Sequence, residues 1–281
     1  MASGYKMAVL IKQVPDTSSA AGVNPDGTVD RARAKRMINP FDKYALQKAI
    51  EIREAHGGEI IVVSMGPPPA MEVLIEALEY GADYGYLLSD RRLAASDTLA
   101  TAYALYKTIV YLKDVDIVFT GLQTTDGDTA QTGPQIAERL DVAQITYCET
   151  MRITDGRILA TRIIDGGIQK LETSPPALVT VANSASRLEH KKFANVHMVK
   201  KLSRDKTEMD KRIKTVTLDD IGAEPERVGL LGSPTVVGKT WKLGEKGGSC
   251  KPFKGEKPSH EVELLAGAVA AEGKGVEEFV I

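Results

Sequence analysis

Short apolar runs alternate with amphipathic segments over the first two thirds of this 281-residue chain, and this alternation restricts its fold more than any other feature. A continuous apolar run is typical of a strand buried on both faces, and apolar residues three or four apart are typical of a helix packed on a sheet. Together they predict an α/β fold with a parallel sheet covered on both faces. The expected strands are 7–11, 59–64, 84–88, 116–120 and 177–181, and the expected helices are 41–56, 68–80, 96–112 and 134–140.

The pattern changes after residue 140. Segments 144–147 and 157–164 have the composition of strands, and Asp155-Gly156 between them is typical of a hairpin turn. From residue 215 onward, glycines and prolines are scattered with little periodicity until a helix-like stretch at 260–271. Such a segment is too poor in apolar residues to form a core of its own. We therefore expect an α/β domain at 1–214 and a C-terminal arm at 215–281 that packs on a partner.

Composition excludes several classes of protein. The chain has 36 basic and 38 acidic side chains, so a nucleic-acid-binding surface that acts through net charge is not expected. No apolar run reaches the ~18 residues of a membrane span, so no membrane insertion is expected. The two cysteines, Cys148 and Cys250, lack the spacing of a disulfide framework, which favours the cytoplasm. Because reactive side chains are so few, the chain is expected either to take its chemistry from a bound cofactor or to perform none.

Familiar catalytic and metal-binding motifs are missing. Residues 232–240 resemble a P-loop, but five residues separate the two glycines and no helix-forming stretch follows, which favours a turn. The four histidines lack metal-binding spacing, and no GxSxG or early GxGxxG motif occurs. We therefore predict no metal site and no catalytic side chain.

The most informative motif is the loop that follows the strand at 116–120. Between Gly121 and Pro134 it carries three glycines and several hydroxyls, and it ends at the start of a helix. Free backbone N–H groups and the helix dipole at such a place favour an anion, and phosphate is the usual one. Asp126 and Asp128 suit the ribose hydroxyls or adenine amine of a nucleotide. The alternative is a plain turn with Asp128 or Thr129 as the helix cap.

Two other loops follow strands in the same manner. Asn39-Pro40-Phe41-Asp42 opens the first helix, and 64–67 ends the strand at 59–64. Because ligands of open α/β sheets bind beyond the carboxyl ends of the strands, the three loops together predict an adenine-nucleotide site. Taken alone, the first loop is equally consistent with an ordinary capped helix.

The sequence resembles the β subunit of electron-transfer flavoproteins. The most specific stretch is 160–171 followed by 176–180, and supporting matches occur at 12–17, 39–42, 64–67, 126–133 and 232–235. The resemblance covers nearly the whole chain and is weakest at 188–214 and after 241. It implies a Rossmann-like, adenine nucleotide α hydrolase-like domain whose extended C-terminal arm packs on an α subunit.

The same resemblance implies a cofactor and a set of residues that hold it. The α subunit of the family carries FAD, and the β subunit holds either a structural AMP or, in electron-bifurcating members, a second FAD that accepts hydride from NADH. Residues 129–132 are expected nearest the phosphates, and Lys12 near the isoalloxazine. The implied cofactor-binding residues are Leu10, Lys12, Asn39, Pro40, Phe41, Asp42, Met65, Gly121, Thr124, Asp126, Gly127, Asp128, Thr129, Ala130, Gln131 and Thr132.

Gly127 favours FAD over AMP. Chains of the AMP type carry three consecutive acids and then Cys-Asn where this chain has 126–130. A glycine in place of an acid removes negative charge and bulk beside the phosphates, which suits a pyrophosphate. The expected function is therefore bifurcation of electrons from NADH to the α-subunit FAD and to a low-potential acceptor, ferredoxin or flavodoxin. The alternative is a non-bifurcating carrier with structural AMP.

The family also docks on a flavin-dependent dehydrogenase, such as an acyl-CoA dehydrogenase, through a loop that here spans about 183–201. Leu188 and Phe193 are the anchor candidates, since apolar hot spots ringed by charge are usual at interfaces. Two other classes of protein remain as alternatives. One is a stand-alone ATP-binding module of the universal-stress type, which gives the long arm no role. The other is an ATP-pyrophosphate-cleaving enzyme, which needs a Ser-Gly-Gly-x-Asp-Ser-like loop where this chain has residues 12–16.

Overall fold

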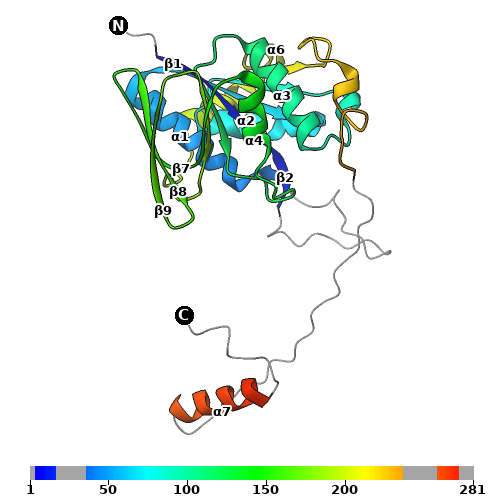
Figure 1. The fold of residues 1–281 in the computed structure, drawn as a ribbon. Coiled ribbons are helices and arrows are strands. Elements are labelled where there is room, and N and C mark those ends of the chain that lie inside the picture. The colour runs from blue at the N-terminus through cyan, green and yellow to red at the C-terminus, as the bar shows by residue number, and fades with distance from the viewer. Residues whose placement is uncertain (1–3, 17–35, 237–257, 272–281) are drawn as a thin grey trace. The chain divides into compact units, whose positions relative to one another are not determined.

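The computed structural model describes residues 4–16, 36–236 and 258–271, and it contains a mixed sheet ordered β11-β5-β4-β1-β6-β10-β7-β8-β9 (Figure 1). The strands from β11 to β7 run parallel, whereas β8 runs antiparallel to β7 and β9 runs antiparallel to β8. A second sheet consists of the antiparallel pair β2 and β3. The strands are β1 (Tyr5–Leu10), β2 (Gln13–Pro15), β3 (Arg36–Ile38), β4 (Gly58–Met65), β5 (Tyr84–Leu88), β6 (Ile117–Gly121), β7 (Ala143–Thr154), β8 (Arg157–Ile164), β9 (Gly167–Thr173), β10 (Ala177–Val181) and β11 (Ile213–Val216).

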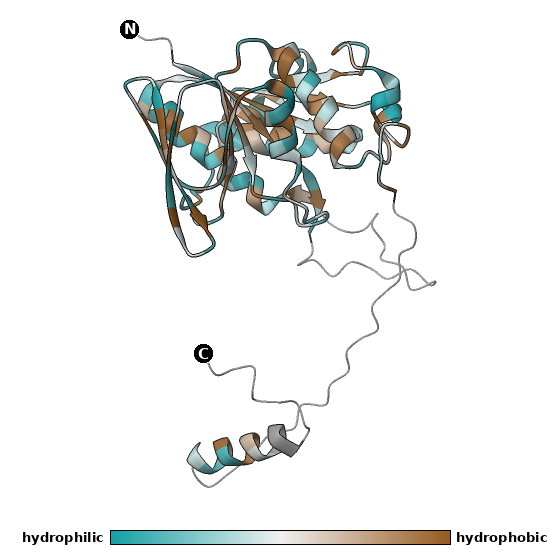
Figure 2. Ribbon diagram, in the orientation of Figure 1, coloured by the Kyte–Doolittle hydropathy of each residue, from teal (hydrophilic) through white to brown (hydrophobic). Residues whose placement is uncertain are grey.

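Helices cover both faces of the parallel part of the sheet. Alternate residues of β1 point to opposite sides, so that Met7 and Val9 join one apolar cluster with α1 and α2, while Ala8 and Leu10 join another with α3 and α4. Figure 2 shows hydrophobic residues gathered on the inner strands. The helices are α1 (Pro40–His56), α2 (Met71–Tyr80), α3 (Thr98–Leu112), α4 (Thr132–Leu140), α5 (Phe193–Leu202), α6 (Lys206–Arg212) and α7 (Pro258–Ala271), with short 3₁₀ turns at Pro68–Ala70, Arg91–Leu93 and Pro225–Arg227.

The topology places a binding crevice beside β1. The chain leaves β1 toward α1 on one face of the sheet, and it leaves the neighbouring strand β6 toward α4 on the other face. Ligands of open α/β sheets bind where strand order reverses in this way, beyond the carboxyl ends of the strands. The predicted α/β class with a largely parallel sheet is confirmed, and it puts the predicted nucleotide loops at one edge.

The chain divides into two compact units, 1–238 and 239–281. In the first unit β11 spans the predicted boundary at residue 214 and pairs with β5 at the edge of the sheet. Beyond it Leu218, Ile221 and Val228 pack against Tyr103 of α3. In the second unit the described part is the helix α7, which overlaps the helix expected at 260–271. Docking of an arm on an α subunit stays a prediction.

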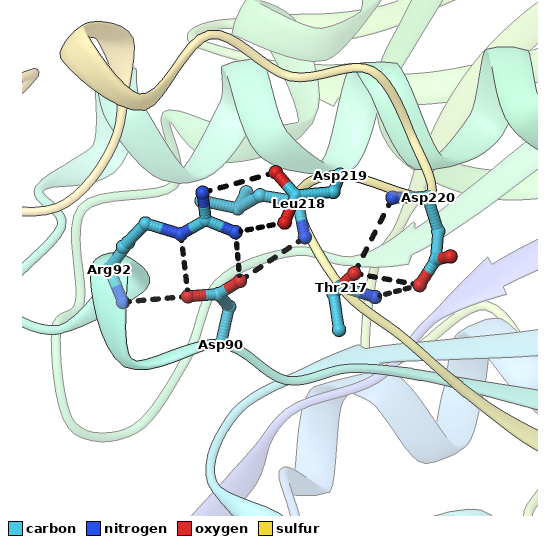
Figure 3. Close-up of polar contacts among 6 residues, drawn as sticks. All are labelled: Asp90, Arg92, Thr217, Leu218, Asp219 and Asp220. Carbon is cyan, nitrogen blue, oxygen red and sulfur yellow. Dashed lines mark hydrogen bonds and ion pairs between the residues drawn. The ribbon is translucent and has the colours of Figure 1, made fainter.

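An ionic clamp holds the start of this C-terminal segment. Figure 3 shows Arg92 between Asp90 and Asp219, with Nη2 2.7 Å from one carboxylate and 2.9 Å from the other. Asp90 also accepts a hydrogen bond from the backbone N–H of Leu218. The hydrogen bonds from Arg92 lower the pKa of Asp90 to about 2, so the clamp is charged across the physiological pH range.

Candidate nucleotide site

A cavity of about 230 Å³ opens at the carboxyl ends of β1, β4 and β6, between the starts of α3 and α4. It is the crevice that the strand order predicts. Its lining combines apolar residues of the strands and of α3 with hydroxyl-bearing residues and the loop after β6. The lining residues are Leu10, Ile11, Lys12, Asp42, Val63, Met65, Ser96, Thr101, Leu105, Thr120, Gly121, Leu122, Gln123, Thr124, Ala130, Thr132 and Gly133.

Asn39 fixes the loop that follows β6. Its side chain is fully buried, donates from Nδ2 to the Gln123 carbonyl (2.8 Å) and accepts at Oδ1 from the N–H of Thr125 (3.2 Å). Although Asn39 stands at the cap position of α1, its side chain makes no capping hydrogen bond to that helix. The helix therefore begins at Pro40 as the alternative of an ordinary helix start expects, but the buried Asn39 amide joins two of the predicted loops instead of capping the helix.

Asp42, in the first turn of α1, joins the same loops through its carboxylate. Its Oδ2 accepts from the N–H of Lys12 (2.7 Å), and Gly121 and Asn39 also donate to the carboxyl group. Burial raises the pKa of Asp42 to about 7, against the opposing effect of these donors. A carbon at the Cβ position of Gly121 would lie 2.6 Å from the carbonyl carbon of Phe41, so only glycine allows this approach.

At the mouth of the cavity Lys12 pairs with Asp126. The Lys12 ammonium lies 2.8 Å from Oδ1 and 2.7 Å from Oδ2, and both side chains are partly exposed. Burial alone would raise the pKa of Asp126, but the hydrogen bond and charge of Lys12 hold it below its ordinary value. Asp128 is hydrogen-bonded to Gln123, so both acids of the loop have partners on the protein.

The helix after the loop starts at Thr132, two residues before the predicted start. Its cap position is Gln131 rather than Asp128 or Thr129, and the Gln131 side chain accepts from the hydroxyl of Thr98 (3.2 Å) instead of capping α4. N–H groups in the first turn of a helix have no partners within the helix. Thr132 and Gly133 thus bring free donors and the positive end of a helix dipole to the cavity wall.

The structure brings half of the predicted cofactor residues to the cavity wall. Those that line it are Leu10, Lys12, Asp42, Met65, Gly121, Thr124, Ala130 and Thr132. The others do not line it, and they are Asn39, Pro40, Phe41, Asp126, Gly127, Asp128, Thr129 and Gln131, of which Asn39, Asp126 and Asp128 form hydrogen bonds with residues of the wall. Sequence reasoning missed Ser96 and Thr101, which border the start of α3 after β5. Their position after a parallel strand was the one sequence feature that could have identified them as part of the site.

The predicted docking loop is tied to α1 and α2. Lys48 donates to the carbonyl of Ala185 (3.2 Å), Gln47 accepts from the N–H of Glu189 (3.2 Å), and Lys191 pairs with Glu79 (2.6 Å). The two anchor candidates differ in exposure. Leu188 is 39% exposed and lines a small depression on α1, whereas Phe193, the first residue of α5, is 84% exposed.

Other types of site receive no support from the described residues. Among them no three His, Cys, Asp or Glu side chains are grouped to hold a metal ion, and no helix is long and apolar enough to cross a membrane. Cys148 is buried, and burial raises the pKa of its thiol to about 11. Its thiolate, the nucleophilic form, is therefore scarce at neutral pH.

Comparison with known proteins decides the family. The electron transfer flavoprotein domain model matches residues 26–220. The chain is 42% identical over 229 residues to the electron transfer flavoprotein subunit beta of Thermoanaerobacterium thermosaccharolyticum, which covers 82% of this chain and 85% of the relative. The chain belongs to the electron transfer flavoprotein β-subunit family.

Other relatives of this flavoprotein subunit have more specific names. The chain is 40% identical to protein FixA of Sinorhizobium fredii, over 82% of its own length and 81% of the length of FixA. It is 35% identical to the acryloyl-CoA reductase electron transfer subunit gamma of Anaerotignum propionicum, over 86% and 90% of the two chains. The resemblance inferred from the sequence motifs is thus confirmed. Association with a flavin or adenine nucleotide and pairing with an α subunit are general features of the family.

Proposed function

We propose that this flavoprotein subunit binds the adenine end of FAD in the cavity at β1 and β6 and works in an NADH-oxidising, electron-bifurcating αβ complex in the cytoplasm. The observation that carries the proposal is the meeting of three strand–helix loops at one cavity, with the start of α4 at its wall. Bound FAD supplies the hydride acceptance from NADH and the passage of single electrons to the α-subunit FAD and to ferredoxin or flavodoxin.

The residues present fit such a group. The first turn of α4 offers backbone N–H donors and a helix dipole to phosphate oxygens. Gly121 removes a side chain where the wall must approach Asp42, and the Thr124 and Thr132 hydroxyls line the same wall. The apolar lining residues Leu10, Val63 and Leu105 would exclude water from a planar ring. The role of the chain is therefore to bind, orient and desolvate the nucleotide.

In this proposal Lys12 acts beyond the adenine end. It stands at the mouth of the cavity, after β1, and its charge is shared with Asp126. A cation at this point can stabilise the negative charge that builds up on a reduced flavin, provided that Asp126 turns to another partner. Leu10, Met65, Asn39 and residues 129–132 belong to this proposal as parts of the wall and of the loop behind it.

A second candidate function is a non-bifurcating carrier with structural AMP. The volume of the cavity favours it, because 230 Å³ is below the roughly 300–1,000 Å³ typical of sites that enclose a larger ligand. Gly127 favours FAD, because no acid stands there beside the phosphates. If FAD is bound, its isoalloxazine must therefore lie outside the cavity.

The nucleotides released from the complex test the two functions. The chain is co-purified with its α subunit, flavin bleaching by NADH is recorded, and FAD and AMP are measured after denaturation. We expect more FAD than the α subunit alone holds, no AMP, and bleaching by NADH. Gly127→Asp should lower FAD retention severalfold, while Gly167→Asp, in open space at the start of β9, should not. AMP in place of the second FAD would leave only the carrier function.

Docking on an acyl-CoA dehydrogenase is expected to depend on Phe193. The side chain is almost fully exposed at the start of α5 and is bordered by the ion pairs of Lys191 and Lys192, an arrangement typical of an interface hot spot. Phe193→Ala should raise the KM for electron exchange with the dehydrogenase about tenfold and leave the nucleotide content unchanged. Leu188→Ala, which removes a half-buried side chain, serves as the comparison. A larger effect from Leu188→Ala would move the anchor to that residue.

A further inference from the structure

A seven-residue segment at 229–235, here termed the strap, lies across the start of α3. The N–H of Gly229 donates to the Ser96 hydroxyl (2.9 Å), and the Ser233 hydroxyl accepts from the N–H of Asp97 (2.8 Å). Thr235 donates to Asp97 Oδ2 from both its N–H (3.1 Å) and its hydroxyl (2.8 Å). The strap therefore contacts two consecutive residues, Ser96 and Asp97, through four hydrogen bonds.

The path of the strap is closely determined by the residues below it. Gly229 has a φ of 60°, and a Cβ there would overlap the carbonyl of Arg92. The buried Ser233 hydroxyl donates to the carbonyl of Gly229 (2.6 Å), which closes the strap on itself. The strap contains the start of the P-loop-like sequence. The hydroxyl groups of Ser233 and Thr235 form hydrogen bonds with Asp97 at the start of α3.

Asp97 connects the strap to the nucleotide cavity. Its Oδ1 caps α3 by accepting from the N–H of Ala100 (3.0 Å), while its Oδ2 holds Thr235. Ser96 and Thr101, on either side of this cap, both line the cavity. The strap is therefore hydrogen-bonded to the helix start that carries Ser96 and Thr101, although Thr235 itself does not line the cavity.

The start of α3 also reaches the start of α4. The hydroxyl of Thr98, next to Asp97, donates to Gln131 at the cap position of α4 (3.2 Å). Hydrogen bonds thus run from Thr235 through the first turn of α3 to the helix start that faces the phosphates in the proposed function. A contiguous set of hydrogen bonds couples two sites only if both sites stabilise the same conformation of one shared element. Here the two sites are the strap and the nucleotide cavity, and the shared element is the first turn of α3.

We propose that Thr235 is a positioning residue for the nucleotide site, and that the strap and the nucleotide stabilise each other through the start of α3. This inference rests on the proposed function, because it takes the cavity as the adenine-nucleotide site. Coupling between two sites is reciprocal, so bound nucleotide must tighten the strap as much as the strap tightens nucleotide binding.

The affinity of the αβ complex for AMP and for FAD, measured after removal of bound nucleotide, tests the first direction. Thr235→Val removes the hydroxyl and keeps the backbone donor, and we expect both affinities to fall on the order of fivefold. Thr235→Ser retains the hydroxyl and should restore the affinity. Thr154→Val, at the exposed end of β7, is the matched control and should change nothing.

Amide hydrogen exchange tests the second direction and separates coupling from a merely structural role. Saturating nucleotide should slow exchange in residues 229–235 of the wild-type complex, and this protection should shrink in Thr235→Val. Unchanged affinity in Thr235→Val, or equal exchange of the strap with and without nucleotide, overturns the inference and leaves the proposed function intact. Failure of the wild-type complex to bind either nucleotide overturns both.

Discussion

Gly121→Ala is expected to abolish nucleotide retention and to lower the free energy of unfolding by about 3 kcal/mol. The added carbon would lie 2.6 Å from the Phe41 carbonyl carbon and 2.8 Å from the Asp42 nitrogen. Both atoms belong to the backbone at the start of α1, so the collision cannot be relieved by a rotamer change. The end of β6 must move away from α1, and the donors that Gly121 and Lys12 offer to Asp42 are then disturbed together.

The chain contains a graded set of controls for this substitution. A Cβ at Gly127 would meet only the Thr124 hydroxyl, at 3.3 Å, and a Cβ at Gly167 would meet nothing within 4 Å. Gly127→Ala should therefore cost little stability, and Gly167→Ala none that urea unfolding can detect. Nucleotide content after gel filtration and the urea midpoint are measured for all three variants. If Gly121→Ala retains its nucleotide at wild-type stability, β6 does not approach α1 as closely as these distances indicate.

The sequence predicts every strand of the main sheet except β9 and β11. The predicted bounds of β5, β8 and β10, which are 84–88, 157–164 and 177–181, agree with the structure, and β10 is the continuous apolar run typical of a strand buried on both faces. The elements that sequence reasoning missed are short or half-solvated. β11 exposes Lys214 and Thr215, β9 alternates exposed and half-buried residues along the sheet edge, and α6 has no buried residue.

The same contrast applies to the candidate site. Glycines, hydroxyls and a proline mark the loop after β6 within a single stretch of sequence, so it was predictable. The role of Asn39 was not, because its partners Gln123 and Thr125 lie more than eighty positions away and its cap position suggested a local role. Ser96 and the strap at 229–235 are separated still further, and only the packed structure brings them together.

Asp42 is expected to make the stability of this flavoprotein subunit decrease as the pH rises from about 4 to about 7. Burial raises the pKa of its carboxyl group from 3.8 to about 7 in the folded protein. Between these values the folded state holds a proton that the unfolded state has lost, so unfolding releases a proton and higher pH favours it. Below pH 4 the protonation of Asp42 contributes its full share, about 4 kcal/mol, to the free energy of unfolding. This contribution decreases as the pH rises and is lost above pH 7.

Asp42→Asn cannot titrate, so its free energy of unfolding should change less with pH over this window than that of the wild type. The substitution also turns one acceptor into a donor facing the N–H groups of Lys12 and Gly121, which lowers stability at every pH. The difference in slope, not in absolute stability, therefore identifies the titration. Urea unfolding at several pH values between 4 and 8 measures it, with Asp165→Asn at the exposed β8–β9 turn as the control. Equal slopes for wild type and Asp42→Asn would mean that Asp42 is charged throughout, held by its three donors despite its burial.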